Sequence, residues 1–117
     1  MIVDDDTDIC MTMQITLEAY GYRTTTASDG AEALHMLETH EAPCLILLDL
    51  MMPGMNGQQF REAQLRNPAF AEIPVVVMSG DYRVKERAAE MGVEGLGKPI
   101  ELPLLLAKVE EFCGCPT

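Results

Sequence analysis

Short apolar runs alternate with amphipathic segments along the whole chain of 117 residues, and this alternation restricts the fold more than any other feature. The runs are rich in Val, Ile, Leu and Thr, as strands are, whereas the segments between them repeat apolar residues at helical spacing. Strands joined by crossover helices predict a parallel five-stranded sheet with helices on both faces, an α/β fold. We expect strands at 1–3, 22–27, 44–48, 75–78 and about 95–97, and helices at about 7–20, 29–39, 58–66, 82–91 and 101–112.

The first expected helix and the third expected strand show the two patterns most clearly. Ile9, Met13, Leu17 and Tyr20 recur at the spacing of one helix face. The run 44–48 is apolar at every position, as expected for a central strand that is covered on both faces. The loop after this strand holds three methionines, which we expect to pack down as apolar residues and not to serve as sulfur ligands: Met51, Met52 and Met55.

Acidic residues outnumber basic ones, and this limits the partners of the chain. The chain carries 19 acidic and 8 basic residues, which give a formal net charge of −11. Nucleic acids and anionic membranes both attract basic surfaces, so we expect neither as a partner. A cationic partner or a metal ion fits this charge better. The length fits a single domain over 1–117, and no apolar stretch approaches the about 20 residues that a membrane-spanning helix needs.

The four cysteines form neither a disulfide framework nor a zinc site by their spacing. Cys10 and Cys44 lie in apolar surroundings, whereas Cys113 and Cys115 are too close in sequence for an easy mutual bridge. Neither histidine has the usual spacing of a zinc ligand relative to that pair. No positively charged start followed by an apolar run is visible, so we expect no secretory signal. We therefore expect four reduced thiols in a cytoplasmic protein.

Chemically reactive side chains follow four of the five expected strands. An acidic triplet, Asp4–Asp6, follows the first strand, and Asp49 follows the third. Ser79 follows the fourth strand and Lys98 the fifth. In open parallel sheets, ligands bind at the carboxyl ends of the strands, where the strand order reverses. The sequence therefore predicts that these four strand ends converge on one site.

Each of these residues alone has a simpler explanation, and their combination carries the interpretation. Acids after a strand often begin a helix or a turn, a serine often caps a helix, and a lysine is usually solvated. Together, Asp5 and Asp49 are a natural pair for Mg²⁺, which takes one or two carboxylates and phosphate oxygens. A carboxylate held there can attack phosphorus. Lys98 and Ser79 would supply the charge and the hydroxyl that phosphoryl transfer uses.

Four motifs together resemble the receiver domains of two-component response regulators. The opening Met-Ile-Val-Asp-Asp-Asp resembles the family's first strand, which ends in acidic residues. The stretch 45–57, Leu-Ile-Leu-Leu-Asp-Leu-Met-Met-Pro-Gly-Met-Asn-Gly, is similar to its phosphorylation loop. Val-Met-Ser-Gly at 77–80 and Gly-Lys-Pro at 97–99 match its Ser/Thr and Lys-Pro positions. The motifs span nearly the whole chain in the family's order, which makes the resemblance specific.

The resemblance implies the flavodoxin-like (βα)₅ fold and a phosphoryl-accepting site. Asp49 would be the phosphoacceptor, and the donor would be a phosphohistidine of a sensor histidine kinase or of a phosphotransfer protein. Mg²⁺ would be bound directly by Asp5, by Asp49 and by the backbone carbonyl of Met51, and through water by Asp4.

The resemblance also implies how the site would act once phosphorylated. Ser79 would reach the phosphoryl group, Lys98 would pair with it, and the Lys98–Pro99 bond would be cis. The domain would regulate a downstream effector or output domain and would turn over no external substrate. The expected output surface is the face of the fourth helix, fifth strand and fifth helix; a monomer and a homodimer through that face both remain open.

The chain departs from the family pattern at several places. Gly95, Leu96 and Gly97 stand where the family usually has an aromatic switch residue, and Ile100 replaces a common aromatic after Lys-Pro. The first strand has only three residues before the acids, which suggests a domain trimmed from a longer regulator. The stretch from the serine to the lysine is about three residues shorter than the family resemblance implies. The acceptor chemistry is therefore better supported than an aromatic-coupled switch.

Three other interpretations compete with the phosphoacceptor. A degenerate receiver would keep the fold as an unphosphorylated interaction module. A Mg²⁺ phosphatase of the haloacid-dehalogenase kind needs Asp-x-Asp followed two residues later by Thr or Val. Asp8 stands there after Asp4 and Asp6, and Met51 replaces the second acid after the third strand. A Ca²⁺ loop of the EF-hand kind needs Gly at its sixth position, where Ile9 stands.

Overall fold

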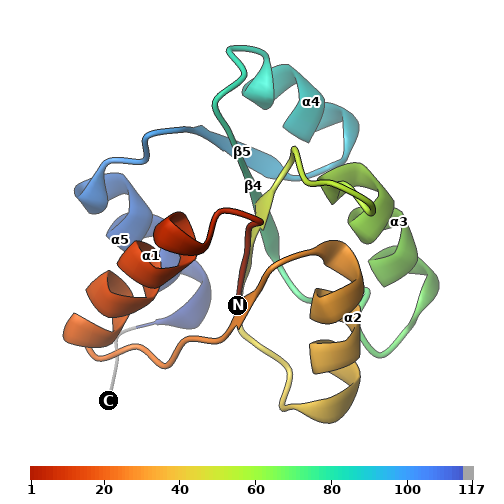
Figure 1. Ribbon diagram of the computed structural model, residues 1–117, viewed down its shortest axis with the longest axis horizontal. Helices are drawn as coiled ribbons and strands as arrows, with labels where there is room; N and C mark the ends of the chain where they lie inside the picture. Colours follow the sequence, from red (N-terminus) through yellow and green to blue (C-terminus); the bar gives the residue numbers. More distant parts are fainter. Residues whose placement is uncertain (115–117) are drawn as a thin grey trace.

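The computed structural model describes residues 1–114, which alternate strictly between strands and helices. Within these residues no helix is long and apolar enough to cross a membrane. Figure 1 shows the helices arranged around a central sheet. The elements in chain order are β1 (Ile2–Val3), α1 (Thr7–Ala19), β2 (Thr26–Ala27), α2 (Gly30–Thr39), β3 (Ile46–Asp49), α3 (Gly57–Arg66), β4 (Val75–Ser79), α4 (Val84–Glu90), β5 (Glu94–Gly97) and α5 (Leu102–Cys113).

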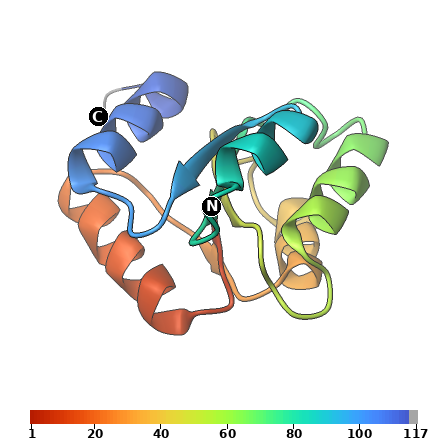
Figure 2. The same cartoon turned by 90° about the horizontal axis from the view of Figure 1, so that it is seen from above.

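The five strands form one parallel sheet in the order β2-β1-β3-β4-β5. Helices α1 and α5 lie side by side on one face, and α2, α3 and α4 cover the other, as the two views show (Figures 1 and 2). The order reverses between β1 and β3, because β2 lies beyond β1 while β4 and β5 lie beyond β3. This is the flavodoxin-like arrangement, and it confirms the expected fold.

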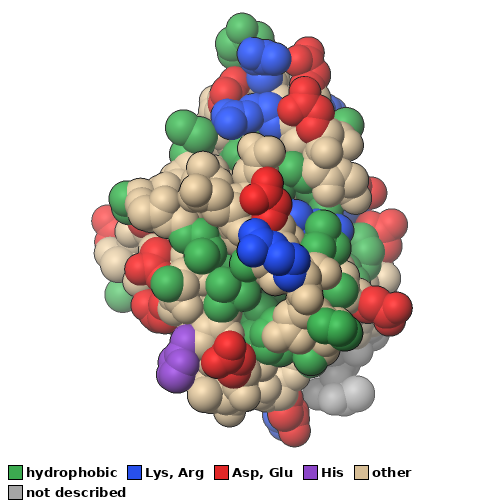
Figure 3. Space-filling model, turned by 90° about the vertical axis from the view of Figure 1, so that its right-hand side faces the viewer, with side chains coloured by type: hydrophobic (Ala, Val, Ile, Leu, Met, Phe, Trp, Pro, Cys, Tyr) green, Lys and Arg blue, Asp and Glu red, His purple; other side chains and the backbone are tan. Residues whose placement is uncertain are grey.

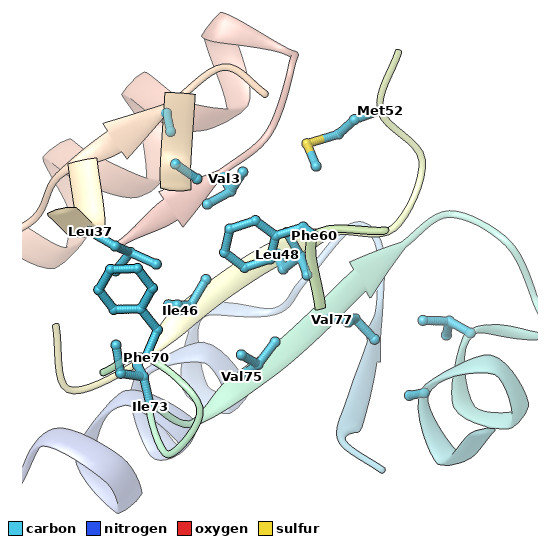
Figure 4. Packing of buried hydrophobic residues seen from close by; sticks show 14 residues of the cluster. Val3, Leu37, Ile46, Leu48, Met52, Phe60, Phe70, Ile73, Val75 and Val77 are labelled. Atoms are coloured by element: carbon cyan, nitrogen blue, oxygen red, sulfur yellow. The ribbon is translucent and has the colours of Figure 1, made fainter. Parts of the chain in front are cut away.

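Two apolar clusters, one on each face, hold the helices to the sheet. On the face of α2, α3 and α4, the fully buried Phe60 lies among strand residues that include Leu48 and Val77 (Figure 4). On the other face, Leu17 of α1 and Val109 of α5 belong to the second cluster. Burial of a large apolar side chain stabilises the fold by about 1.5–3 kcal/mol, so the central strands carry much of the stability.

Polar side chains cap the starts of three helices, α1, α2 and α3. The Asp6 carboxylate accepts hydrogen bonds from the backbone N–H groups of Asp8 and Ile9 and so begins α1. Asn56 and Gln59 form a reciprocal capping box at the start of α3. Such caps satisfy N–H groups that have no partner inside the helix. Both caps follow loops at the carboxyl edge of the sheet.

Three local predictions differ from the structure. The second strand is shorter than expected, because only Thr26 and Ala27 pair with β1. Tyr20, which the helical spacing predicts on the same face as Met13 and Leu17, is half exposed and follows the last turn of α1. Cys10 takes part in that buried face instead. Met51 does not pack down, since 60% of it is exposed, whereas Met52 is buried as expected.

The prediction of four reduced thiols is wrong, because Cys44 and Cys113 form a disulfide. Helix α5 packs across the sheet so that its last residue reaches the segment just before β3, with the two Cα atoms 5.3 Å apart. Spacing in sequence did not reveal this pair, which is 69 positions apart. Cys10 is a buried free thiol, and Cys115 lies outside the described residues. The thiol argument for a cytoplasmic location is therefore lost.

Candidate functional site

Four strand ends converge at one edge of the sheet, as the sequence predicts. Asp4 follows β1, Asp49 ends β3, Ser79 ends β4, and Lys98 follows β5. The strands β1, β3, β4 and β5 are consecutive neighbours in the sheet and all run in the same direction. The reversal of strand order between β1 and β3 leaves the carboxyl edge accessible there, the usual position of a ligand site in such folds.

Three carboxylates form a compact acidic cluster at this edge. Asp4, Asp5 and Asp49 each present an oxygen, and these oxygens lie within 4.8 Å of one another. Asp4 and Asp49 are buried, whereas Asp5 is exposed. Closely spaced carboxylates repel one another unless a cation lies between them. The donor set is all oxygen, which suits a hard divalent cation such as Mg²⁺.

The ammonium group of Lys98 neutralises part of this cluster. Its Nζ atom donates to Oδ2 of Asp4 at 2.7 Å and lies 3.4 Å from Oδ1 of Asp49. Burial works to lower the pKa of Lys98, but its hydrogen bond to Asp4 and the charge of Asp49 outweigh burial, and the net pKa is raised. Lys98 therefore stays charged and faces both buried acids.

The surroundings of Asp49 disfavour the ionised form of its carboxyl group. Burial, followed by the nearby charge of Asp4, raises the pKa of Asp49 to about 6. Lys98 and the backbone N–H of Met51, which donates to Oδ1 at 3.3 Å, oppose this shift. A group whose pKa is perturbed by burial and by defined charges is a candidate for chemistry. A bound cation would favour the ionised form of this carboxyl.

Asp4 is held by contacts that leave it little freedom. Its Oδ1 accepts the backbone N–H of Asp6, and its Oδ2 accepts from Lys98. The thiol of Cys10 donates a hydrogen bond to the backbone carbonyl of Asp4 at 3.3 Å. Burial raises the pKa of that thiol to about 11, so Cys10 stays protonated. These contacts suit an indirect role for Asp4 and leave the exposed Asp5 carboxylate freer to bind a cation.

The loop after β3 packs closely against the strand that holds Asp49. A Cβ atom on Gly57 would lie 2.8 Å from the backbone oxygen of Asp49 and 2.9 Å from Cα of Leu50. Gly57 donates its N–H to the carbonyl of Leu50 at 3.2 Å. Met55 of the same loop packs against Gly30 at the start of α2. The glycine after the loop is therefore required by close contact with the backbone beside the acceptor.

Ser79 is placed with its hydroxyl proton still available. It is buried, and its Oγ accepts the backbone N–H of Asp81 at 3.0 Å. A hydroxyl has one donor and two acceptor sites, so this bond leaves the O–H free to donate. The backbone carbonyl of Ser79 accepts the N–H of Lys98 at 2.8 Å. The expected cis bond between Lys98 and Pro99 is present.

The structure thus brings together most of the residues that the sequence singled out. Asp4, Asp5, Asp49 and Lys98 share one cluster, and Ser79 ends the neighbouring strand. Sequence reasoning missed two contributors, the close approach of Gly57 and a contact of Arg87 on α4 with Asp81 and Met51. The role of Gly57 could have been found from the sequence, because the loop after the third strand contains glycines. The contact of Arg87 has no sequence pattern that predicts it, because it depends on how α4 lies over the loops.

Comparisons with known proteins identify the family of the chain. A sequence model described as the response regulator receiver domain matches residues 1–110. The chain is 37% identical over 113 residues to the transcriptional regulatory protein PrrA of Mycobacterium tuberculosis, covering 94% of this chain and 47% of that protein. It is 33% identical over 112 residues to the response regulator MprA of Mycobacterium ulcerans, covering 93% and 47%. The chain spans less than half the length of these curated relatives.

Solved structures show the same fold over nearly the whole chain. The chemotaxis protein CheY4 of Vibrio cholerae superimposes with a TM-score of 0.83 at 28% identity, covering 95% of this chain and 94% of that one. The signal receiver domain of a signal transduction histidine kinase from Syntrophus aciditrophicus gives a TM-score of 0.84 at 29% identity, covering 95% and 86%. The arrangement of strands and helices in this chain is thus the one found in these solved structures.

Proposed function

Because the chain belongs to the family of response regulator receiver domains, we propose that Asp49 accepts a phosphoryl group from the phosphohistidine of a sensor histidine kinase or of a phosphotransfer protein. A receiver domain is a regulatory module and not an enzyme that turns over an external substrate. The observation that carries the proposal is the buried Asp49 carboxylate, which lies beside two further acids and 3.4 Å from the ammonium of Lys98.

The transfer step would form one bond and break one bond. An oxygen of the Asp49 carboxylate attacks phosphorus, and the phosphorus–nitrogen bond of the donor breaks as the imidazole leaves with the electron pair. The product is an acyl phosphate on Asp49. Phosphoryl transfer depends mainly on positioning and charge neutralisation. The N–H of Met51 at Oδ1 and the charge of Lys98 supply both for the attacking carboxylate.

The acidic cluster fits Mg²⁺, which when bound would neutralise the acids and the oxygens of the incoming phosphoryl group. We assign Asp5, Asp49 and the backbone carbonyl of Met51 as its protein ligands. Asp4 would act mainly through water, since both of its carboxylate oxygens already accept hydrogen bonds within the protein. This assignment predicts that Asp5 is needed for cation binding, because it is the exposed carboxylate of the cluster.

Phosphorylation would then change the loops around the site. It adds roughly two negative charges and three acceptor oxygens. Ser79 can donate its free hydroxyl proton to one of those oxygens, and Lys98 can pair with another. Movement of Ser79 would shift the loop that connects β4 to α4, and with it the start of α4. We therefore assign the face of α4, β5 and α5 as the output surface. That face would bind a downstream effector, an output domain or a second copy.

The proposal is tested by the mass of the intact chain after incubation with phosphoramidate and Mg²⁺. We expect a gain of one phosphoryl group, and no gain for Asp49→Asn or when a chelator replaces Mg²⁺. Asp8→Asn is the matched control, because Asp8 is an exposed carboxylate outside the acidic cluster. It should gain the same mass as the unchanged chain.

Two outcomes would contradict the assignment. An unchanged mass in the wild-type chain would favour the alternative of a degenerate receiver that acts without phosphorylation. A mass gain that survives Asp49→Asn would place the phosphoryl group on another residue.

A further inference from the structure

The disulfide between Cys44 and Cys113 is an accessible bond at the opposite end of the strands from the acidic cluster. Cys44 lies just before β3, the strand that ends in Asp49. Cys44 is exposed, and Cys113 is half-buried. Both cysteines line a cavity of about 660 Å³, whose wall also includes Tyr22 and His40. Exposed disulfides are commonly the ones that exchange with thiols, whereas buried ones resist reduction.

The bond joins a well-packed segment to a poorly packed one. All residues of β3 are buried, so the strand after Cys44 is held firmly in the sheet. The buried residues of α5 are Leu105 and Val109, and both lie before its last turn. That turn contains Phe112, which is 36% exposed. Apolar packing therefore holds the end of α5 only weakly.

The charges at the end of α5 also disfavour a helical last turn. The carbonyl groups at the carboxyl end of a helix favour nearby cations and disfavour anions. Glu110 and Glu111 lie in this turn, which contains no basic residue. Lys108 offsets part of this repulsion, because its ammonium group lies 3.3 Å from the Glu111 carboxylate. The hydroxyl of Tyr22 donates to the carbonyl of Gly114 at 3.0 Å, but this bond is exposed to water. The disulfide is therefore the strongest restraint on the end of the helix.

We propose that the Cys44–Cys113 disulfide is a site of thiol–disulfide exchange with a dithiol reductant, and that its reduction releases the last turn of α5 while the rest of the domain stays folded. The inference goes beyond the proposed function, because the chemistry at the disulfide does not involve Asp49. The two are linked only through α5, which belongs to the assigned output surface. The oxidised and reduced chains then present different ends of that surface to a partner.

The exchange takes place in two steps that balance atoms and electrons. A thiolate of the dithiol attacks the sulfur of Cys44, the more exposed of the two cysteines, and the bond to Cys113 breaks. Cys113 leaves with the electron pair as a thiolate and takes a proton from water. The second thiol of the reductant then loses its proton and attacks the first sulfur of the reductant, which displaces Cys44 as a thiolate that is protonated in turn. The chain gains two electrons and two protons, and the dithiol becomes a disulfide.

The change is confined to the α5 side of the sheet. Val84 and Ala88 of α4 belong to the apolar cluster on one face, whereas Cys113 packs against the cluster on the other. Helix α4 lies directly on β5, since a Cβ atom on Gly95 would be 2.9 Å from Cβ of Ala88. Figure 3 shows basic and acidic side chains gathered at the top of the molecule, where α4 lies in Figure 1. Reduction should therefore alter the α5 end of the output surface and leave these charges in place.

The exchange is tested on the folded chain with Cys115→Ser, which removes the cysteine outside the described residues. The chain is incubated with dithiothreitol without denaturant and alkylated with iodoacetamide, and the labelled peptides are identified by mass spectrometry. We expect labels on Cys44 and Cys113 and none on Cys10, a buried free thiol that becomes accessible only when the chain unfolds. Without dithiothreitol, none of the three should be labelled. A disulfide that is reduced only when urea also exposes Cys10 would overturn the inference.

Amide hydrogen exchange tests the release of the helix end. On reduction, exchange at Cys113 and Gly114 should speed up by about tenfold or more, because helix ends with few tertiary contacts open at little cost in free energy. The amides of α4 and β4 should keep their rates. The double variant Cys44→Ser with Cys113→Ser should exchange like the reduced chain. Unchanged rates at the end of α5 after reduction would show that packing alone holds this turn, which contradicts the inference.

Phosphorylation of the reduced chain keeps this inference distinct from the proposed function. The oxidised and reduced chains should gain the same mass from phosphoramidate and Mg²⁺, because Asp49 and Cys44 lie at opposite ends of β3. If neither chain gains mass, the proposed function fails, whereas the labelling and exchange results still support the inference. A mass gain that reduction abolishes would show that the change reaches the acceptor, which overturns its confinement to α5.

Discussion

Lys98 and Asp4, 94 positions apart in sequence, form an ion pair of 2.7 Å at the carboxyl edge of the sheet. Asp4 is 1% exposed, so its charge has little access to water. The pair joins the residue after β1 to the residue after β5, across β3 and β4. It thereby places a lysine beside Asp49, which lies on the strand next to β1.

Loss of this lysine should destabilise the fold. Removal of one partner from a buried ion pair leaves an uncompensated charge, and because Lys98 is partly exposed we expect Lys98→Met to lose on the order of 2–4 kcal/mol. Urea unfolding at pH 7 measures the loss. Lys85→Met is a control for removal of a lysine that forms none of the ion pairs found among the described residues. Equal unfolding free energies for Lys98→Met and the wild type would contradict the buried pair.

Asp49→Asn should stabilise the chain at neutral pH when divalent cations are removed. The folded protein raises the pKa of Asp49 from 3.8 to about 6, so the folded state binds the proton more tightly than the unfolded state. The wild-type chain should therefore gain stability as the pH falls from 7 through 6 toward 4, relative to Asp49→Asn. Thermal unfolding of both proteins between pH 7 and pH 4, in the presence of a chelator, measures the direction of this change in stability. A stability difference that does not change with pH would contradict it.

Reduction of the disulfide should lower the free energy of unfolding without unfolding the site. The bond closes a loop of 69 positions, and a cross-link of this kind stabilises by about 2–4 kcal/mol. Denaturation with and without a reducing agent measures the difference. The double variant Cys44→Ser with Cys113→Ser should match the reduced protein and show no response to reductant. Two free thiols at these positions in the native, air-exposed protein would contradict the bond.

Gly57 should not tolerate a side chain, whereas Gly80 should. A methyl group on Gly57 would press on the backbone of Asp49, so Gly57→Ala should cost about 1–3 kcal/mol and disturb the acceptor. A Cβ atom on Gly80 meets nothing within 4 Å, which makes Gly80→Ala the matched control. Urea unfolding and the phosphoryl mass gain should both separate the two variants. Equal unfolding free energies and equal mass gains for Gly57→Ala and Gly80→Ala would show that Gly57 lies farther from the backbone of β3.

Much of the fold and most of the candidate site could be predicted from local patterns. The apolar run before Asp49 and the run before Ser79 identified the two central strands, because strands covered on both faces are continuously apolar. The short edge strand β2 was predicted too long. Its sequence is β-branched, but only Thr26 and Ala27 pair with β1. Strand propensity alone does not set where pairing begins.

The features that the sequence did not reveal all depend on packing between distant segments. Cys44 and Cys113 meet only because α5 crosses the sheet toward the start of β3. Arg87 reaches Met51 only because α4 settles on the backbone at Gly95. Neither contact has a spacing rule in sequence, since each is set by the position of a helix on the sheet. By contrast, parallel topology alone brings the strand-end residues together.

The most direct test of the account is to trap the phosphoryl group on its residue. The phosphorylated chain is treated with borohydride, which reduces an acyl phosphate of aspartate to homoserine, and the peptides are then sequenced by mass spectrometry. The account predicts homoserine at position 49 and at no other position, and none when phosphoramidate or Mg²⁺ is omitted. Homoserine at Asp4 or Asp5, or a phosphorylated chain with an unreduced Asp49, would contradict it.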